Sequence, residues 1–248
     1  MTFNGASNPT KLDIEYDRDC DWLPMFRGAT FGKLEDITFR PESEQIDDPL
    51  EAFEKVALAA SIQNTVTEFR LHTSRSWNPN YSSLLPFTQL TDIIIEFSCD
   101  DGCSSRLDDD IITKMARAMP KLQFLVLGDS PCREVPIGVT AKGFAALANH
   151  CSDLRTLCVY FQVATLSVPP VIDGMTSDFG PTALRRDCAL IDLLVGRISV
   201  TEESVLAVAQ TLVWISPHIR MFTTWADKNW EKVLDAICDS RKSGRLPG

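Results

Sequence analysis

The residues best suited to catalysis are Gly128-Asp129-Ser130, which follow an apolar stretch with the pattern of a β-strand. A serine in such a place can attack an ester, but it needs a histidine base. Hydrolases that use this GDS sequence take the histidine from a D-x-x-H segment near the C-terminus, and neither His150 nor His218 has an aspartate three residues before it. We therefore interpret GDS as a turn after a strand. A serine esterase is a remote alternative, which an ester-hydrolysis assay with Ser130→Ala would test.

Two clusters could in principle bind a metal, and both are better explained as ordinary structure. Cys99 and Cys103 lie in CDDGC, but no second close pair of Cys or His follows to complete a zinc site. The run 108–110 is all aspartate but lacks the alternating ligands and terminal Glu of a calcium loop. Acids at a helix N-terminus explain this run better, because they suit the positive end of the helix dipole. The chain has no phosphate-binding glycine motif, and we expect no metal and no cofactor.

Composition favours a globular chain inside the cell. The 248 residues are 44% hydrophobic and 23% charged, with a net charge of −10. The acidic charge disfavours nucleic-acid binding, and no apolar run is long enough for a membrane helix. The start of the chain lacks the pattern of a secretory signal, so we expect a cytoplasmic or nuclear location. The eight cysteines are then reduced, and we expect four of them to be small buried residues: Cys151, Cys158, Cys188 and Cys238.

An apolar-x-x-apolar-x-apolar pattern recurs along the chain and is the main structural signal. The copies begin at residues 34, 66, 90, 122, 154, 190 and 219, which are 24 to 36 residues apart. The clearest are Leu122–Leu125–Leu127 and Leu154–Leu157–Val159. The others are Leu34–Ile37–Phe39, Val66–Phe69–Leu71, Leu90–Ile93–Ile95, Leu190–Leu193–Val195 and a degraded Ile219–Phe222, with a partial Leu12–Ile14 before them.

Helical patterns lie between the predicted strands. Thr140 can cap a helix with the stripe Phe144, Leu147, Ala148 and Cys151. Further helices are predicted over residues 50–62, which carry Phe53, Val56, Leu58 and Ala60, and around three other stripes. These stripes are Ile111, Ile112, Met115 and Met119, then Val205, Val208, Leu212 and Ile215 after a cap at Thr201, and finally Trp230, Val233, Leu234 and Ile237.

About seven strand–turn–helix units of this kind predict an α/β solenoid of leucine-rich repeats, a horseshoe with parallel strands on the concave side and helices outside. A doubly wound α/β domain is the alternative, although it would not require the same strand pattern in every unit. The predicted organisation is a partial first repeat or extension over 1–30, the repeat domain over 31–243 and a tail over 244–248. Residues 163–180 are predicted to be an insertion loop, and 72–87 an irregular connection without a good helix.

With the repeats aligned, the sequence resembles the leucine-rich-repeat region of fungal F-box-type proteins, over about residues 30–240. The family's "mP.L..L.LG" strand and "gvT..gl.aLa.hC..L..L.i.F" unit are matched in this chain. The matching residues are Met119, Pro120, Leu122, Leu125, Leu127 and Gly128, then Thr140, Leu147, Ala148, His150, Cys151, Leu154, Leu157 and Phe161.

This resemblance implies a non-catalytic protein-interaction module, the substrate-recognition part of a ubiquitin-ligase subunit. The family also has an F-box of about 45 residues, which docks the ligase adaptor, and residues 1–30 are too short and too polar to supply it. The adaptor is therefore expected as a partner only if an F-box lies upstream. The alternative is a stand-alone repeat scaffold with no link to ubiquitin, and the partner is an unidentified protein in both cases.

Strand alternation predicts which residues a partner would contact. In each strand the repeat residues point into the core and their neighbours point outward. The outward set is charged in the first strands, where it contains Asp36, Thr38, Arg40, Glu68, His72, Asp92 and Glu96, and becomes apolar and aromatic in the middle. Exposed apolar and aromatic residues often mark interfaces. The predicted protein-binding surface consists of Arg70, Ile94, Phe124, Val126, Cys158, Tyr160 and Leu194. The alternative is that another segment, such as 163–180, covers these residues.

Overall fold

The computed structural model describes residues 10–16, 31, 34–41, 48–73, 79–97, 107–127, 138–159, 192–194, 200–216, 218–222 and 228–242. The chain forms two compact units. Unit 1 comprises residues 1–106 and 126–135, and unit 2 comprises residues 107–125 and 136–248. Predictions for residues 1–9, 17–30, 163–180 and 244–248 lie outside the described residues, and so do those for Gly128-Asp129-Ser130, Cys99, Cys103, Cys188 and the side chain of Ala60.

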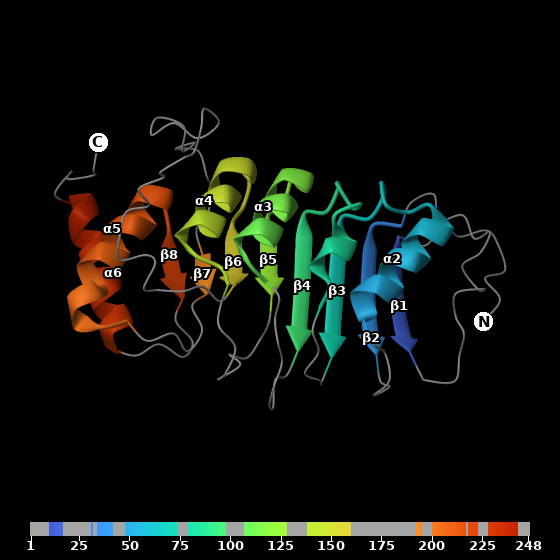
Figure 1. The fold of residues 1–248 in the computed structure, drawn as a ribbon, viewed down its shortest axis with the longest axis horizontal. Coiled ribbons are helices and arrows are strands. Elements are labelled where there is room, and N and C mark those ends of the chain that lie inside the picture. The colour runs from blue at the N-terminus through green and yellow to red at the C-terminus, as the bar shows by residue number, and fades with distance from the viewer. Residues whose placement is uncertain are drawn as a thin grey trace. The chain divides into compact units, whose positions relative to one another are not determined.

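Unit 1 is a parallel sheet in which the strands follow one another in sequence order. The strands are β1 (Lys11–Tyr16), β2 (Asp36–Pro41), β3 (Glu68–Thr73) and β4 (Asp92–Phe97). Helix α2 (Pro49–Ala60) connects β2 to β3, and a short 3-10 helix, η1 (Tyr81–Leu84), connects β3 to β4. In Figure 1, α2 lies in front of β2, so that the connections run on one face of the sheet. Over its described residues 79–87, the segment predicted as an irregular connection has this 3-10 helix, as expected; residues 74–78 lie outside the described residues.

Unit 2 repeats the same alternation. Helix α3 (Asp109–Ala118) precedes β5 (Phe124–Leu127), whose last two residues belong to unit 1, and α4 (Ala141–His150) precedes β6 (Thr156–Val159). Strand β7 (Asp192–Leu194), the 3-10 helix η3 (Glu202–Ser204), α5 (Val205–Ile215), β8 (Arg220–Phe222) and α6 (Lys228–Lys242) follow. Strands β6, β7 and β8 pair in parallel, and α3 packs against α4 and α5 against α6 (Figure 1).

The repeat pattern is the core. Every described residue of the six copies that begin at 34, 66, 90, 122, 154 and 190 is buried, and so is Ile219 of the degraded copy. In β3, β5 and β6 burial alternates residue by residue, as the period of a half-buried strand requires. The core of unit 1 is completed by aromatic rings: Phe53 of α2 stacks on Phe69 of β3 at 4.2 Å and on Phe87 at 4.6 Å between ring centroids. Phe87 thus supplies apolar contact in the part of the connection that follows η1.

The predicted helices form, with two corrections in their buried faces. Thr140 caps α4 as predicted, since its hydroxyl accepts a hydrogen bond from the Lys142 N–H. Helix α4 is buried around most of its surface rather than along one stripe. Leu58 was predicted to be in the apolar face of its helix, but it is 53% exposed because the helix turns it away from Phe53 and Val56. Helix α5 begins after Ser204, and the predicted cap residue Thr201 instead precedes η3.

The cysteine prediction is also only partly right. Cys151 is fully buried, and its thiol donates to the carbonyl oxygens of Ala116 and Met119 at the end of α3, at 3.7 and 3.5 Å. Cys158 is half-buried on β6. Cys238 is exposed, because α6 directs Trp230, Val233 and Ile237 to the core and leaves position 238 on the outer side. None of the three is in a disulfide.

Successive strands are registered by backbone bonds that repeat. The residue before each of β2, β3 and β5 offers one carbonyl oxygen to two consecutive N–H groups that lead into the next strand. Glu35 accepts from Thr67 and Glu68, both at 2.9 Å, and Thr67 accepts from Thr91 and Asp92 at 2.8 and 3.1 Å. In unit 2, Gln123 accepts in the same way from Arg155 and Thr156, at 2.8 and 3.0 Å. These bonds place equivalent residues of neighbouring strands side by side.

Aspartates at helix starts make a second connection, between neighbouring strand–helix repeats of the same unit. Asp108 caps α3, and Asp109, in the first turn, reaches the N-terminus of α4. One carboxylate oxygen of Asp109 accepts from the N–H groups of Thr140 and Gly143 at 2.8 and 2.9 Å, and the other accepts from the Thr140 hydroxyl at 2.6 Å. In unit 1, Asp48 caps α2 and also accepts from the Asn80 N–H at 2.8 Å.

We predict that Asp109→Ala lowers the free energy of unfolding by about 2–3 kcal/mol, because three donors at the start of α4 lose a charged acceptor. Asp110→Ala is the matched control. Asp110 is the next residue of the same turn, and its carboxylate is 70% exposed and paired with Lys114. The control should cost less than about 1 kcal/mol. Chemical denaturation of both variants gives the comparison, and equal losses would contradict the role of Asp109.

Gly143→Ala gives a second prediction about the same contact. A Cβ at Gly143 would lie 2.5 Å from the Asp109 carboxylate oxygen, which is closer than the atoms can approach. Although alanine normally stabilises a helix by about 1 kcal/mol over glycine, here it should destabilise. In an Asp109→Ala background the cost should fall by about 1 kcal/mol or more, and a double-mutant cycle measures this coupling. Additive costs would show that the close approach is not the cause.

Candidate functional site

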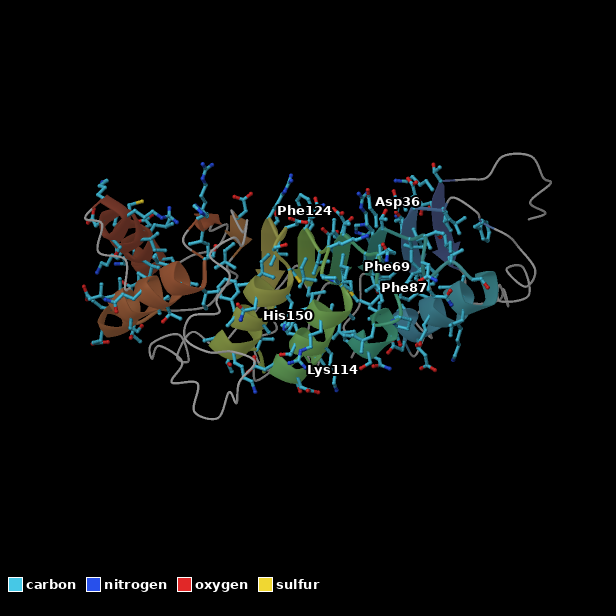
Figure 2. The ribbon with its side chains drawn as sticks, turned by 90° about the horizontal axis from the view of Figure 1, so that it is seen from above. Asp36, Phe69, Phe87, Lys114, Phe124 and His150 are labelled. Carbon is cyan, nitrogen blue, oxygen red and sulfur yellow. The ribbon has the colours of Figure 1, made fainter. Side chains whose placement is uncertain are left out.

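The candidate site of unit 1 is the sheet face that bears the side chains between the repeat residues, called here the open face of unit 1. In Figure 2, Asp36 lies on this side of the sheet, while Phe69 and Phe87 lie on the side of α2. Most of its side chains are partly or largely exposed. Its members are Lys11, Asp13, Glu15, Asp36, Thr38, Arg40, Glu68, Arg70, His72, Asp92, Ile94 and Glu96.

Strand register arranges these side chains in rows across the sheet. The first row contains Lys11, Asp36, Glu68 and Asp92, one from each strand. The second contains Asp13, Thr38, Arg70 and Ile94 in the same order. Neighbouring strands lie about 4.8 Å apart, so side chains in one row are within contact distance. Thr38 was predicted to be outward and available, but it is buried, because the longer side chains of this face surround it.

Ion pairs connect neighbouring strands of this face. Lys11 donates to Asp36 at 2.7 Å, and Arg40 lies 3.4 Å from Asp13 and 3.8 Å from Glu15. Arg70, a predicted contact residue, is paired with Glu68 of its own strand at 2.8 Å. These side chains are about half exposed, except for Asp36, so each pair contributes little to stability. Their effect is to fix the direction of the charges that an incoming molecule meets.

His72 is the one histidine on this face. Its Nδ1 lies 2.6 Å from a carboxylate oxygen of Glu96, its register neighbour on β4. The pair holds both side chains in one orientation beside Ile94. No histidine, cysteine or acid of the described residues forms a group of three that could hold a metal ion. The face presents charged and hydrogen-bonding side chains to the solvent.

The open face of unit 2 is smaller and more apolar. Phe124 begins β5, and the bonds from Arg155 and Thr156 to Gln123 align it with Thr156 of β6. Thr156 is in register with Asp192, and Cys158 is in register with Leu194. In Figure 2, Phe124 lies on the opposite side from Lys114 and His150, which belong to the helix layer. Phe124 and Cys158 are half-buried, so each retains surface that a partner can contact.

The predicted binding residues therefore divide between the units. Arg70 and Ile94 lie on the open face of unit 1, and Val126, also half-buried, belongs to unit 1 through the end of β5. Phe124 and Cys158 lie on the open face of unit 2. The backbone of Leu194 is in β7, while its side chain and all of Tyr160 lie outside the described residues. The strand period was the signal that identified this set.

In the described part of the chain, three side chains have shifted pKa values, and all three lie on helices. A hydrogen bond to Glu51 raises the pKa of Lys55, and a hydrogen bond to Asp110 raises the pKa of Lys114. A hydrogen bond from Lys232, at 2.6 Å, lowers the pKa of Glu202. All three are exposed pairs, and the Lys232–Glu202 pair connects α6 to η3. Such shifts reflect surface ion pairing and do not mark a reaction centre.

The open face predicts a contrast between adjacent residues of β5. Phe124→Ser should change the free energy of unfolding by about 1 kcal/mol or less, because the ring is only half-buried. Leu125→Ser should cost at least about 3 kcal/mol, because it leaves a cavity and a buried hydroxyl in the core. Thermal or urea denaturation of the two variants measures the difference. If Phe124→Ser is the more damaging change, the assignment of faces is wrong.

The chain is an α/β protein. In each unit the strands pair in parallel and helices connect them. Within the described residues, no helix is long and apolar enough to cross a membrane. No model of a known protein family matches the chain, and the curated proteins contain no significant match.

Proposed function

We propose that the chain is a leucine-rich-repeat solenoid that binds another protein through its open faces and has no catalytic role. The observation that carries the proposal is the repeated contrast on each strand. The repeat residues are buried almost completely, while the residues between them are mostly half-exposed and differ in charge and shape from strand to strand. A constant core with a variable surface is the arrangement by which repeat proteins present extended binding surfaces.

The chemistry of the open faces suits recognition. Unit 1 presents fixed ion pairs around Arg70 and Ile94, and unit 2 presents Phe124 on β5 and Cys158 on β6. Aromatic and arginine side chains dominate the binding energy of protein interfaces, because they combine a large apolar area with directed hydrogen bonds. Arginine occurs on the open face of unit 1 and phenylalanine on that of unit 2, and the charged groups of these faces can exclude wrong partners.

The finer proposal is that the chain recognises substrates for a ubiquitin ligase of the F-box type. It is supported by the resemblance of residues 119–128 and 140–161 to the repeat region of fungal F-box-type proteins. In the described part of these segments, Thr140 caps a helix and Cys151 bonds to the end of the preceding helix. These roles give the T and C of the motif a structural purpose.

We predict that Phe124→Ser and Ile94→Ser each reduce partner capture at least tenfold. Leu206→Ser and Leu58→Ser are the matched controls. Leu206 lies in unit 2 and Leu58 in unit 1, and both are exposed apolar residues on helices, at 57% and 53%. The full-length gene product is used as bait in a lysate of its native host, and captured proteins are quantified by mass spectrometry. Denaturant unfolding must first show that the free energy of unfolding of each variant is within about 1 kcal/mol of that of the unmodified protein.

Two results would contradict the proposal. Equal capture by all four variants and the unmodified protein would show that the open faces do not bind the partner. Equal loss in the helix controls would show that capture follows general apolar exposure. The ubiquitin link is judged by the captured proteins themselves: ligase adaptor subunits support it, and a reproducible partner without any ligase component supports a stand-alone scaffold.

A further inference from the structure

The open face of unit 1 carries more negative than positive charge, and the excess is concentrated on one strand. Across β1–β4 it presents six acidic residues and three basic ones, an excess of three carboxylates over lysine and arginine. The acids are Asp13, Glu15, Asp36, Glu68, Asp92 and Glu96, and the bases are Lys11, Arg40 and Arg70.

All three bases are already paired with acids of β1, β2 and β3. Lys11 pairs with Asp36, Arg40 with the two acids of β1, and Arg70 with Glu68. On β4, Asp92 accepts a hydrogen bond from the Thr91 hydroxyl at 2.5 Å, and Glu96 is bonded to His72. Within the described residues, no Lys or Arg pairs with either acid of β4. Among the described residues, the two carboxylates of β4 are thus the acids of this face that have no Lys or Arg partner.

These two carboxylates flank an apolar side chain. The side chains of residues 92, 94 and 96 lie on the same face of β4. Successive ones are therefore about 6.6 Å apart, and the first and last are about 13 Å apart. Ile94 is half-buried between them, and the side chain of Glu96 is 44% exposed. Arg70 is the register neighbour of Ile94. The charge of Arg70 disfavours a third cation over Ile94, so an apolar group of the partner suits that position.

We propose that Asp92, Ile94 and Glu96, which follow one another along the open side of β4, bind an extended basic segment of a partner protein with the pattern Arg-x-Leu-x-Arg. This rests on the proposed function and names the chemistry of the partner at one part of the open face. In an extended segment that lies along β4, alternate residues have the same spacing as Asp92, Ile94 and Glu96. Each arginine then meets a carboxylate, where two parallel hydrogen bonds can form, and the leucine covers Ile94.

The test uses three fluorescein-labelled peptides of equal composition except where stated. The first contains Arg-Ser-Leu-Ser-Arg between Gly-Ser flanks, the second has its two arginines adjacent, and the third replaces both arginines by glutamate. Binding to the full chain is followed by fluorescence anisotropy at about 0.05 M salt, where screening is weaker than at physiological ionic strength. We expect the first peptide to bind at least tenfold more tightly than the other two.

Charge-neutralising variants locate the binding. Asp92→Asn with Glu96→Gln preserves shape and should weaken the first peptide at least tenfold. Glu231→Gln with Asp235→Asn removes the same two charges from exposed positions on α6 and should leave the affinity unchanged. Equal weakening by both pairs would overturn the proposal, because binding would then follow the overall charge of −10. Equal affinity for spaced and adjacent arginines would overturn it as well.

The capture assay separates this inference from the function on which it rests. If Ile94→Ser abolishes capture while the peptides show no preference for spaced arginines, the open face binds a partner of different chemistry. If capture is unchanged in Ile94→Ser and Phe124→Ser, the interaction function itself is wrong, whatever the peptides show.

Discussion

Two aspartates of this chain connect one strand–helix repeat to the start of the next. The donors at the start of α4 are satisfied by the carboxylate of Asp109, which belongs to the preceding helix, and the N–H of Asn80 is satisfied by Asp48 from the preceding connection. A helix N-terminus leaves several N–H groups without partners inside the helix, and burial makes such groups costly. The stacking order is therefore required by hydrogen bonding as well as by apolar burial.

The buried half of the fold could be predicted because it depends on local periodicity. Spacing within each copy determines which side of a strand is apolar, and the copies at 34, 66, 90, 122 and 154 are buried as expected. Leu58 and Cys238 show where this reasoning is weaker. Both lie on helices whose rotation about their own axis is decided by larger neighbours, and a pattern of apolar letters cannot rank one apolar residue against another.

Long-range polar contacts were not predictable in the same way. The acids at 108–110 were correctly assigned to a helix start, but Asp109 has a partner 31 residues later in the chain. Its role depends on how two helices sit side by side, which sequence spacing alone does not give. A signal was present, since a glycine three residues after a capping threonine is unusual inside a helix and here makes room for a carboxylate. The open faces show a similar division. Their members follow from the strand period, whereas the pairing of Arg70 with Glu68 required the structure.

Registration by a single carbonyl oxygen has a consequence for how such a chain can evolve. The bonds from Thr67 and Glu68 to Glu35, and from Arg155 and Thr156 to Gln123, use only main-chain atoms next to the strand starts. They impose no requirement on the number of residues that leave one strand and return to the next. Insertions, deletions and side-chain changes in the connections therefore leave the strand alignment intact, and so do substitutions of the residues between the repeat positions. Natural variation can change the side chains of the open faces while the strands keep their alignment.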